Sequence, residues 1–161
     1  MNDKVVEFAE GQLKKVGMAD SLSADFISKM RAGEPLIQNA FQKAYEDGTA
    51  AITQHWKKSP SSDNYFLNKF QAEVKPAGQE EARSHTFYHT FKRSLNDEGQ
   101  QQAPKQGELN FTMKEAYNLL SGRPVLKTVA NKAGEPEATW MQLNLKNKQD
   151  NGNYEMRSYR P

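Results

Sequence analysis

Between residues 50 and 92, apolar side chains recur at every second position, and this period constrains the fold more than any other feature of the sequence. Such alternation is typical of strands that bury one face and expose the other. Turn-forming residues at 59–63 and 76–78 divide the segment. The pattern therefore predicts an antiparallel meander with one apolar face, formed by Ala50, Ile52, Trp56, Phe66, Phe70, Ala72, Val74, His85, Phe87, His89 and Phe91.

Two helices are expected before this meander. Apolar residues at positions 5, 8, 9, 13 and 16 share one helix face, and Asn2 or Asp3 provides the N-cap. A second stripe at 22, 26, 27 and 30 follows a cap at Ser21 or Ser23. Residues 36–46 fit a helix as well as a strand, but the turn signal at 47–48 leads us to favour a strand.

A third helix is expected in the C-terminal part of the chain. Thr112 and Glu115 have the spacing of a capping box, and Gly122 follows the last apolar residue of the stripe. A short strand at 125–129 and a hairpin around the turn at 151–152 complete the predicted fold. We thus predict an α+β protein with two N-terminal helices, an antiparallel β-meander, a short capped helix and a C-terminal β-hairpin.

Residues 96–108 contain two glycines, a proline and no large apolar side chain, so we expect them to form a mobile loop or linker. This divides the chain into a helical hairpin plus sheet at 1–95 and a helix plus hairpin at 109–161. The two parts could also form one composite domain.

Composition places the chain among globular proteins. Leu, Ile, Val and Phe make up about 17% of the 161 residues, which is low, but the net charge is only +2 and aromatic residues reach 10%. No apolar run is long enough for a membrane span, and residues 1–4 do not resemble a secretion signal. The absence of cysteine fits a reducing compartment. We therefore expect a cytoplasmic protein that does not bind membranes.

No motif predicts catalysis. His85 and His89 lie four residues apart, but in a strand their side chains are separated by about 13 Å, too far to share one metal ion. The chain has no thiol, no nucleophile elbow and no phosphate-binding loop. We expect a protein that is not an enzyme and that uses neither a metal nor another cofactor.

Two groups of basic and aromatic residues are candidates for nucleic-acid binding. If the meander is correct, the face opposite its apolar side chains collects His55, Lys57, Tyr65, Lys69, Tyr88 and Lys92. Aromatic rings interleaved with lysine on an open sheet can stack bases and neutralise phosphates. The alternatives are a face covered by the N-terminal helices and an ordinary solvated sheet. The second group lies around the C-terminal hairpin and contains Arg123, Lys127, Trp140, Arg157 and Tyr159.

Trp140 and Arg123 in the second group have alternative interpretations. Trp140 is out of phase with Met141, Leu143 and Leu145, so we expect it on the other face of its strand. There it either packs against the preceding segment or contacts a ligand, and we favour the packing. Arg123 follows the end of the third helix. There it either complements the helix dipole or projects towards a partner, and we favour the structural role.

Several segments resemble an uncharacterised domain family found in proteins of bacterial conjugative transposons. They are the run from Asn110 to Arg123, with its Ser-Gly-Arg end, Asn131-Lys132, residues 140–143 and residues 151–154. Weaker similarity extends through 65–70 and 85–88. The resemblance implies an accessory protein of a mobile element, in some cases next to DNA-processing domains, and it implies no catalytic residues.

Two functions are therefore expected. The first is a protein-interaction or structural module of a mobile element, which its low net charge and small size favour. The second is a nucleic-acid accessory protein that binds single-stranded or duplex nucleic acid, which the sequence pI near 8.7 and the basic-aromatic face favour.

Overall fold

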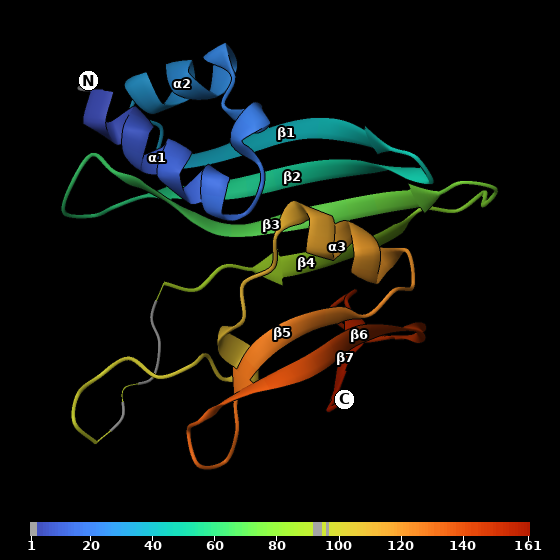
Figure 1. Ribbon diagram of the computed structural model, residues 1–161. Helices are drawn as coiled ribbons and strands as arrows, with labels where there is room; N and C mark the ends of the chain where they lie inside the picture. Colours follow the sequence, from blue (N-terminus) through green and yellow to red (C-terminus); the bar gives the residue numbers. More distant parts are fainter. Residues whose placement is uncertain (1–2, 92–94, 96) are drawn as a thin grey trace.

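The computed structural model describes residues 3–91, 95 and 97–161 (Figure 1). It confirms the α+β fold, with three α-helices and two antiparallel sheets among these residues. The helices are α1 (Asp3–Lys15), α2 (Ala24–Arg31) and α3 (Met113–Leu120), and two 3-10 turns are η1 (Ala19–Ser21) and η2 (Gln106–Glu108). The first sheet contains β1 (Leu36–Tyr45), β2 (Gly48–Lys58), β3 (Tyr65–Pro76) and β4 (Arg83–Tyr88), and the second contains β5 (Val125–Ala130), β6 (Pro136–Lys148) and β7 (Tyr154–Tyr159).

Both sheets follow the order of the sequence. The first is the predicted meander β1-β2-β3-β4, and residues 36–45 belong to it as a strand. The second, β5-β6-β7, joins the predicted short strand to the predicted hairpin. No helix in the described ranges has the length and apolar character needed to cross a membrane.

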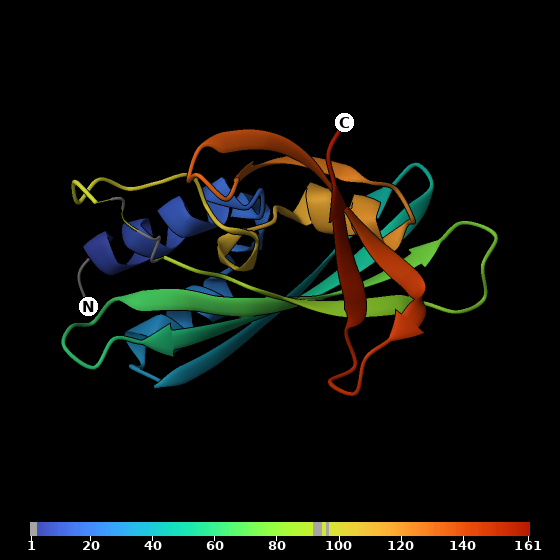
Figure 2. The same cartoon turned by 90° about the horizontal axis from the view of Figure 1, so that it is seen from below.

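The helices cover one face of the first sheet, and α3 lies between the two sheets (Figures 1 and 2). Phe26 of α2 packs on Trp56 of β2 with their ring centroids 5.1 Å apart. Met113, Ala116, Tyr117 and Leu120 of α3 belong to the same buried cluster as the core residues of β3. The segments 1–95 and 109–161 therefore share one hydrophobic core.

The N-termini of α2 and α3 begin as their sequences predict. The Ser23 side chain accepts a hydrogen bond from the Phe26 backbone N–H at 3.1 Å. At α3, Thr112 and Glu115 exchange bonds of 3.1 and 2.9 Å in a complete capping box. Gly122 has a φ of +95°, which favours glycine after a helix. The candidate cap Asn2 lies outside the described residues.

A β-bulge in β3 overturns part of the predicted face assignment. His55 lies opposite Lys69, but Trp56 lies opposite Leu67, so Asn68 is an extra residue that shifts the alternation by one. Tyr65 is consequently fully buried, and its hydroxyl donates a 2.6 Å hydrogen bond to the Glu34 carbonyl. The prediction that Tyr65 lies on the open face, and that Phe66 lies in phase with Phe70, is wrong.

Three side-chain amides bind the backbone at the edge of the first sheet. Gln12 donates to the Tyr65 carbonyl at 2.8 Å and accepts from the Leu67 N–H at 3.0 Å. Asn153 pairs with both backbone groups of Thr86 in the same way, and Asn110 pairs with those of Thr90. Each amide therefore takes the place of a neighbouring strand, which protects the edge from pairing with another chain.

Residues 97–108 contain the turn η2 and run close to the second sheet. The Pro104 carbonyl accepts a 2.8 Å hydrogen bond from the Ala130 N–H, and Gln106 accepts one of 3.0 Å from Ser158. Leu95 and Gln101 form an isolated bridge. The mobility expected for residues 96–108 stays a prediction.

His85 is buried where β4 meets the second sheet. Its Nδ1 accepts a 3.1 Å hydrogen bond from the Tyr154 N–H, so this nitrogen is unprotonated in the fold. Burial, with the charge of Lys148 as a smaller cause, lowers the pKa of His85 to about 4. His89 lies beyond the end of β4. In the described segments no three His, Asp or Glu side chains come together as metal ligands.

We predict that acidification destabilises the protein through His85. Because its folded pKa lies below the ordinary value of 6.5, the neutral form stabilises the fold above pH 6.5, and this contribution is lost as the pH falls towards 4. The loss amounts to about 2 kcal/mol at pH 5. Urea unfolding of wild type and His85→Gln at pH 7.5 and pH 5 measures it. Equal pH dependence in the two proteins would contradict this role.

Candidate binding surfaces

The outer face of the first sheet, the face away from the helices, carries a row of basic and aromatic side chains. His55, Lys69 and Tyr88 lie opposite one another on β2, β3 and β4. Tyr88 is 63% exposed, and the Lys69 Nζ lies 5.6 Å from the centroid of its ring. Lys57 lies opposite Leu36, which is 67% exposed, at the same end of the sheet. The structure thus places four of the six predicted residues of this face together.

The charge on this row comes from its lysines. Partial burial and the neighbouring Lys69 lower the pKa of His55, so its imidazole is neutral at pH 7. Of the two remaining predicted residues, Tyr65 belongs to the core, and Lys92 lies outside the described residues. The row therefore offers two ammonium groups and one exposed aromatic ring.

Lys127 is held inside the structure. Its Nζ lies 2.9 Å from Glu115 Oε1 and also donates to the Asn110 carbonyl at 2.8 Å, and its side chain is only 17% exposed. The Phe111 ring lies 5.2 Å from the same ammonium group. This ion pair joins β5 to the capping box of α3. Lys127 is therefore not available to bind a nucleic acid, contrary to the prediction from the sequence.

Arg123 joins α3 to the β1–β2 turn. Its Nη1 lies 2.8 Å from Asp47 Oδ2, and its Nε and Nη2 donate to Asn118 Oδ1 at 3.1 and 2.9 Å. The Tyr117 hydroxyl donates to the other Asp47 oxygen. Hydrogen bonds from Tyr117 and Arg123 lower the pKa of Asp47, which keeps it ionised. These contacts support the structural role that we favoured for Arg123.

The outer face of the second sheet, the face away from α3, carries an apolar row across all three strands. Leu126 of β5, Trp140 of β6 and Tyr159 of β7 lie opposite one another. Leu126 is 49% and Tyr159 46% exposed, and Trp140 is half-buried. Met141 and Leu143 are buried on the other face, so the predicted phase of Trp140 is confirmed. We call these three residues the apolar row.

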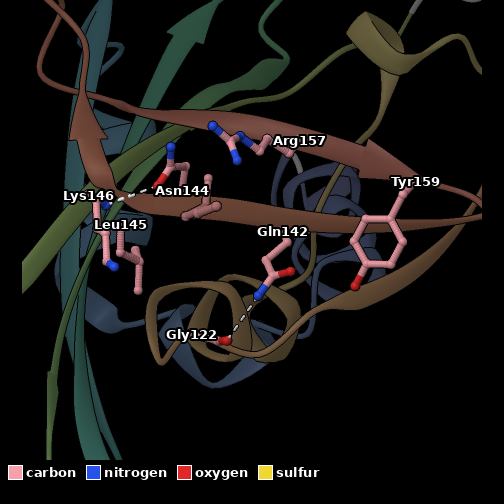
Figure 3. Close-up of a pocket in the computed structure, with 8 residues that line it drawn as sticks. Gly122, Gln142, Asn144, Leu145, Lys146, Arg157 and Tyr159 are labelled. Atoms are coloured by element: carbon pink, nitrogen blue, oxygen red, sulfur yellow. Dashed lines mark hydrogen bonds between the residues drawn. The ribbon is translucent and has the colours of Figure 1, made fainter.

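A shallow pocket lies next to the apolar row (Figure 3). Gln142 points toward Gly122 and donates a 3.4 Å hydrogen bond to its carbonyl. Arg157, which lies opposite Gln142 on β7, is 64% exposed at its side chain and bonds Glu155 at 2.7 Å. The remaining polar side chains of the pocket are Asn144 and Lys146. The pocket adds hydrogen-bonding groups and cations beside an exposed apolar surface.

Comparisons with protein-family models, with curated proteins and with solved structures find no match for this chain. The resemblance to proteins of conjugative transposons is untested by these comparisons and stays a prediction. The two surfaces described above are therefore the basis from which we infer a function.

Proposed function

We propose that the protein is a non-enzymatic, cytoplasmic protein-interaction module of a mobile genetic element, and that it binds its partner through the outer face of the second sheet. The apolar row of Leu126, Trp140 and Tyr159 is the observation that carries this proposal. Trp, Tyr and Arg are the residue types that contribute most to protein interfaces, and here Arg157 borders the row. The mobile-element context comes from the sequence resemblance alone.

The contiguity of the exposed apolar side chains on this face supports the proposal. Exposed apolar side chains scattered singly need no explanation, but here they are contiguous across three paired strands. The two rows on one side of it are polar, with Gln142 opposite Arg157 and Asn144 opposite Glu155, and on the other side Thr128 lies opposite Ala138. An apolar centre with a polar rim is the arrangement of a protein-binding site.

Affinity capture from extracts of cells that encode the protein tests this proposal. We expect wild type to retain a partner protein that the Leu126→Lys variant loses. Gln71→Lys, an exposed substitution on the first sheet with the same change of charge, is the matched control and should retain the partner. A set of bound proteins that Leu126→Lys leaves unchanged would refute binding through this face.

A second candidate function, nucleic-acid binding, is favoured by the row of His55, Lys69 and Tyr88 with Lys57 beside it. An exposed ring next to two ammonium groups can stack a base and neutralise phosphates. Only a few contacts of this kind are available, so affinity should be modest, and its fall with rising salt should correspond to about two neutralised phosphates.

Fluorescence titration of labelled single-stranded and duplex DNA at low and moderate salt tests this candidate. If it is correct, Lys57→Glu and Lys69→Glu weaken binding, and Lys29→Glu on α2 does not, although each variant changes the charge equally. No binding of wild type at low salt would eliminate the candidate.

A further inference from the structure

β1 forms the outermost strand of the first sheet, on the side away from β4. Lys58 donates a 3.0 Å backbone hydrogen bond to the Pro35 carbonyl. Because successive residues of a strand direct their backbone groups to opposite edges, the odd-numbered residues of β1 bond β2. The N–H and C=O groups of residues 36, 38, 40, 42 and 44 therefore point away from the sheet, and no described residue bonds them.

No other described segment runs alongside this edge (Figures 1 and 2). The helix α2 lies over the inner face of the sheet, because its Phe26 packs on Trp56 of β2. On that face β1 is buried only in its N-terminal half, at Ile37 and Asn39, whereas Lys43 is exposed. The helices therefore leave the edge of β1 open.

The edge of β1 also lacks the features that keep strand edges from pairing with another chain. The strand has ten residues and pairs with β2 in one unbroken register. Its one charged residue, Lys43, lies on the inner face, and its outer face carries only apolar and amide side chains. A long, regular edge with so little charge is a surface for pairing with another strand.

We propose that two copies of the chain pair through β1 to form a homodimer, antiparallel about a two-fold axis that passes through Ala40 perpendicular to the sheet. This register is the one in which every outward-facing residue from 36 to 44 meets an outward-facing residue of the other copy. It places Gln38 opposite Gln42 of the partner subunit. It also places Leu36, which is 67% exposed, opposite Ala44 of the partner subunit. On the outer face, amides thus meet amides and apolar side chains meet apolar side chains.

The antiparallel arrangement keeps the helices of the two copies apart. They cover the N-terminal half of β1 in each copy, and these halves lie at opposite ends of the paired strands. The two four-stranded sheets become one continuous sheet with both outer faces on the same side, so the two rows of His55, Lys69 and Tyr88 share one surface. The outer face of the second sheet takes no part in this pairing. The dimer and the partner proposed above can therefore be tested separately.

Sedimentation velocity of the full chain over a wide range of concentration tests the dimer with no other protein present. A single strand pair buries little surface, so we expect a weak, reversible monomer–dimer equilibrium for wild type. Because Ala40 lies on the axis, Ala40→Lys alone or Ala40→Glu alone places two like charges opposite each other, and each should raise the dissociation constant about tenfold. An equal mixture of the two should form a heterodimer at least as tight as the wild-type dimer. Gln71→Lys, at an exposed position of β3, is the control and should dimerise like wild type.

Disulfide crosslinking tests the register, since the chain contains no cysteine. Residues opposite each other in a hydrogen-bonded pair have Cα atoms about 5.5 Å apart, which a disulfide can span. Ala40→Cys should therefore give a crosslinked dimer on mild oxidation. Gln42→Cys should not, because its two copies would lie about 13 Å apart along the strands.

Circular dichroism of each variant shows whether the fold is intact. A wild type that is monomeric at all concentrations, a mixture no tighter than the single variants alone, or crosslinking at position 42 with none at position 40 would overturn the proposal. None of these results changes what the capture experiment measures.

Discussion

Replacing Gln54 with Ala is expected to lower the free energy of unfolding by about 3 kcal/mol or more, because it removes three buried hydrogen bonds and leaves the Trp56 indole N–H without an acceptor. Gln54 has no exposed surface. Its Oε1 accepts 3.0 Å hydrogen bonds from Asn39 Nδ2 and Trp56 Nε1, and its Nε2 donates to Ser21 Oγ at 2.8 Å. One side chain thus connects β1, β2 and the turn η1.

The loss follows from the cost of an unsatisfied buried group. Without the Gln54 amide, the Trp56 indole N–H loses its acceptor in a region that water does not reach. Each such group costs about 1–3 kcal/mol, and the small cavity adds to this. Urea unfolding at pH 7 measures the change. Gln42→Ala, at an exposed position of β1, is the control and should change stability little. Equal effects of the two substitutions would show that the Gln54 hydrogen bonds do not stabilise the fold.

Gly48→Ala is expected to destabilise the protein by about 2–3 kcal/mol, because a Cβ atom at this position would collide with its neighbours. It would lie 2.8 Å from the Lys75 carbonyl oxygen and 2.8 Å from the Tyr117 hydroxyl. The β1–β2 turn would have to move away from α3, and the hydrogen bond between Tyr117 and Asp47 would break. Glycine is required at this position because the β1–β2 turn lies very close to the end of β3 and to α3.

Gly11→Ala is the matched control for Gly48→Ala. Gly11 lies in α1, and a Cβ atom there would meet nothing within 4 Å. Alanine favours a helix over glycine by about 1 kcal/mol, so this substitution should stabilise the protein. Thermal unfolding of both variants gives the comparison. A Gly48→Ala variant as stable as wild type would show that the turn does not dock on α3 as described.

The sequence predicts most elements of the fold because their signals are local. The capping box of Thr112 and Glu115 and the glycine after α3 are within ten residues of each other, and the alternation in β2 follows from its own residues. The bulge at Asn68 is different, since an inserted residue is defined only by the register against β2. It moved Tyr65 from the predicted open face into the core.

The candidate surfaces could be predicted only in part. The period of two is enough to place Lys57, Lys69 and Tyr88 on one face, but the apolar row requires the register of three strands, and Leu126 carries no signal of its own. The partners of Lys127 and Arg123 could not be predicted either. Asp47 is 76 residues from Arg123 along the chain, and contacts of this kind depend on tertiary packing.

Site-specific photocrosslinking in cells tests the central claim, that the protein binds another protein through the outer face of the second sheet. A photoreactive phenylalanine analogue replaces Tyr159 in one variant and Tyr88 in the other, two exposed tyrosines on different sheets. We expect a discrete crosslinked protein with the probe at 159 and none with the probe at 88. Crosslinks to protein or nucleic acid at 88, with none at 159, would contradict it.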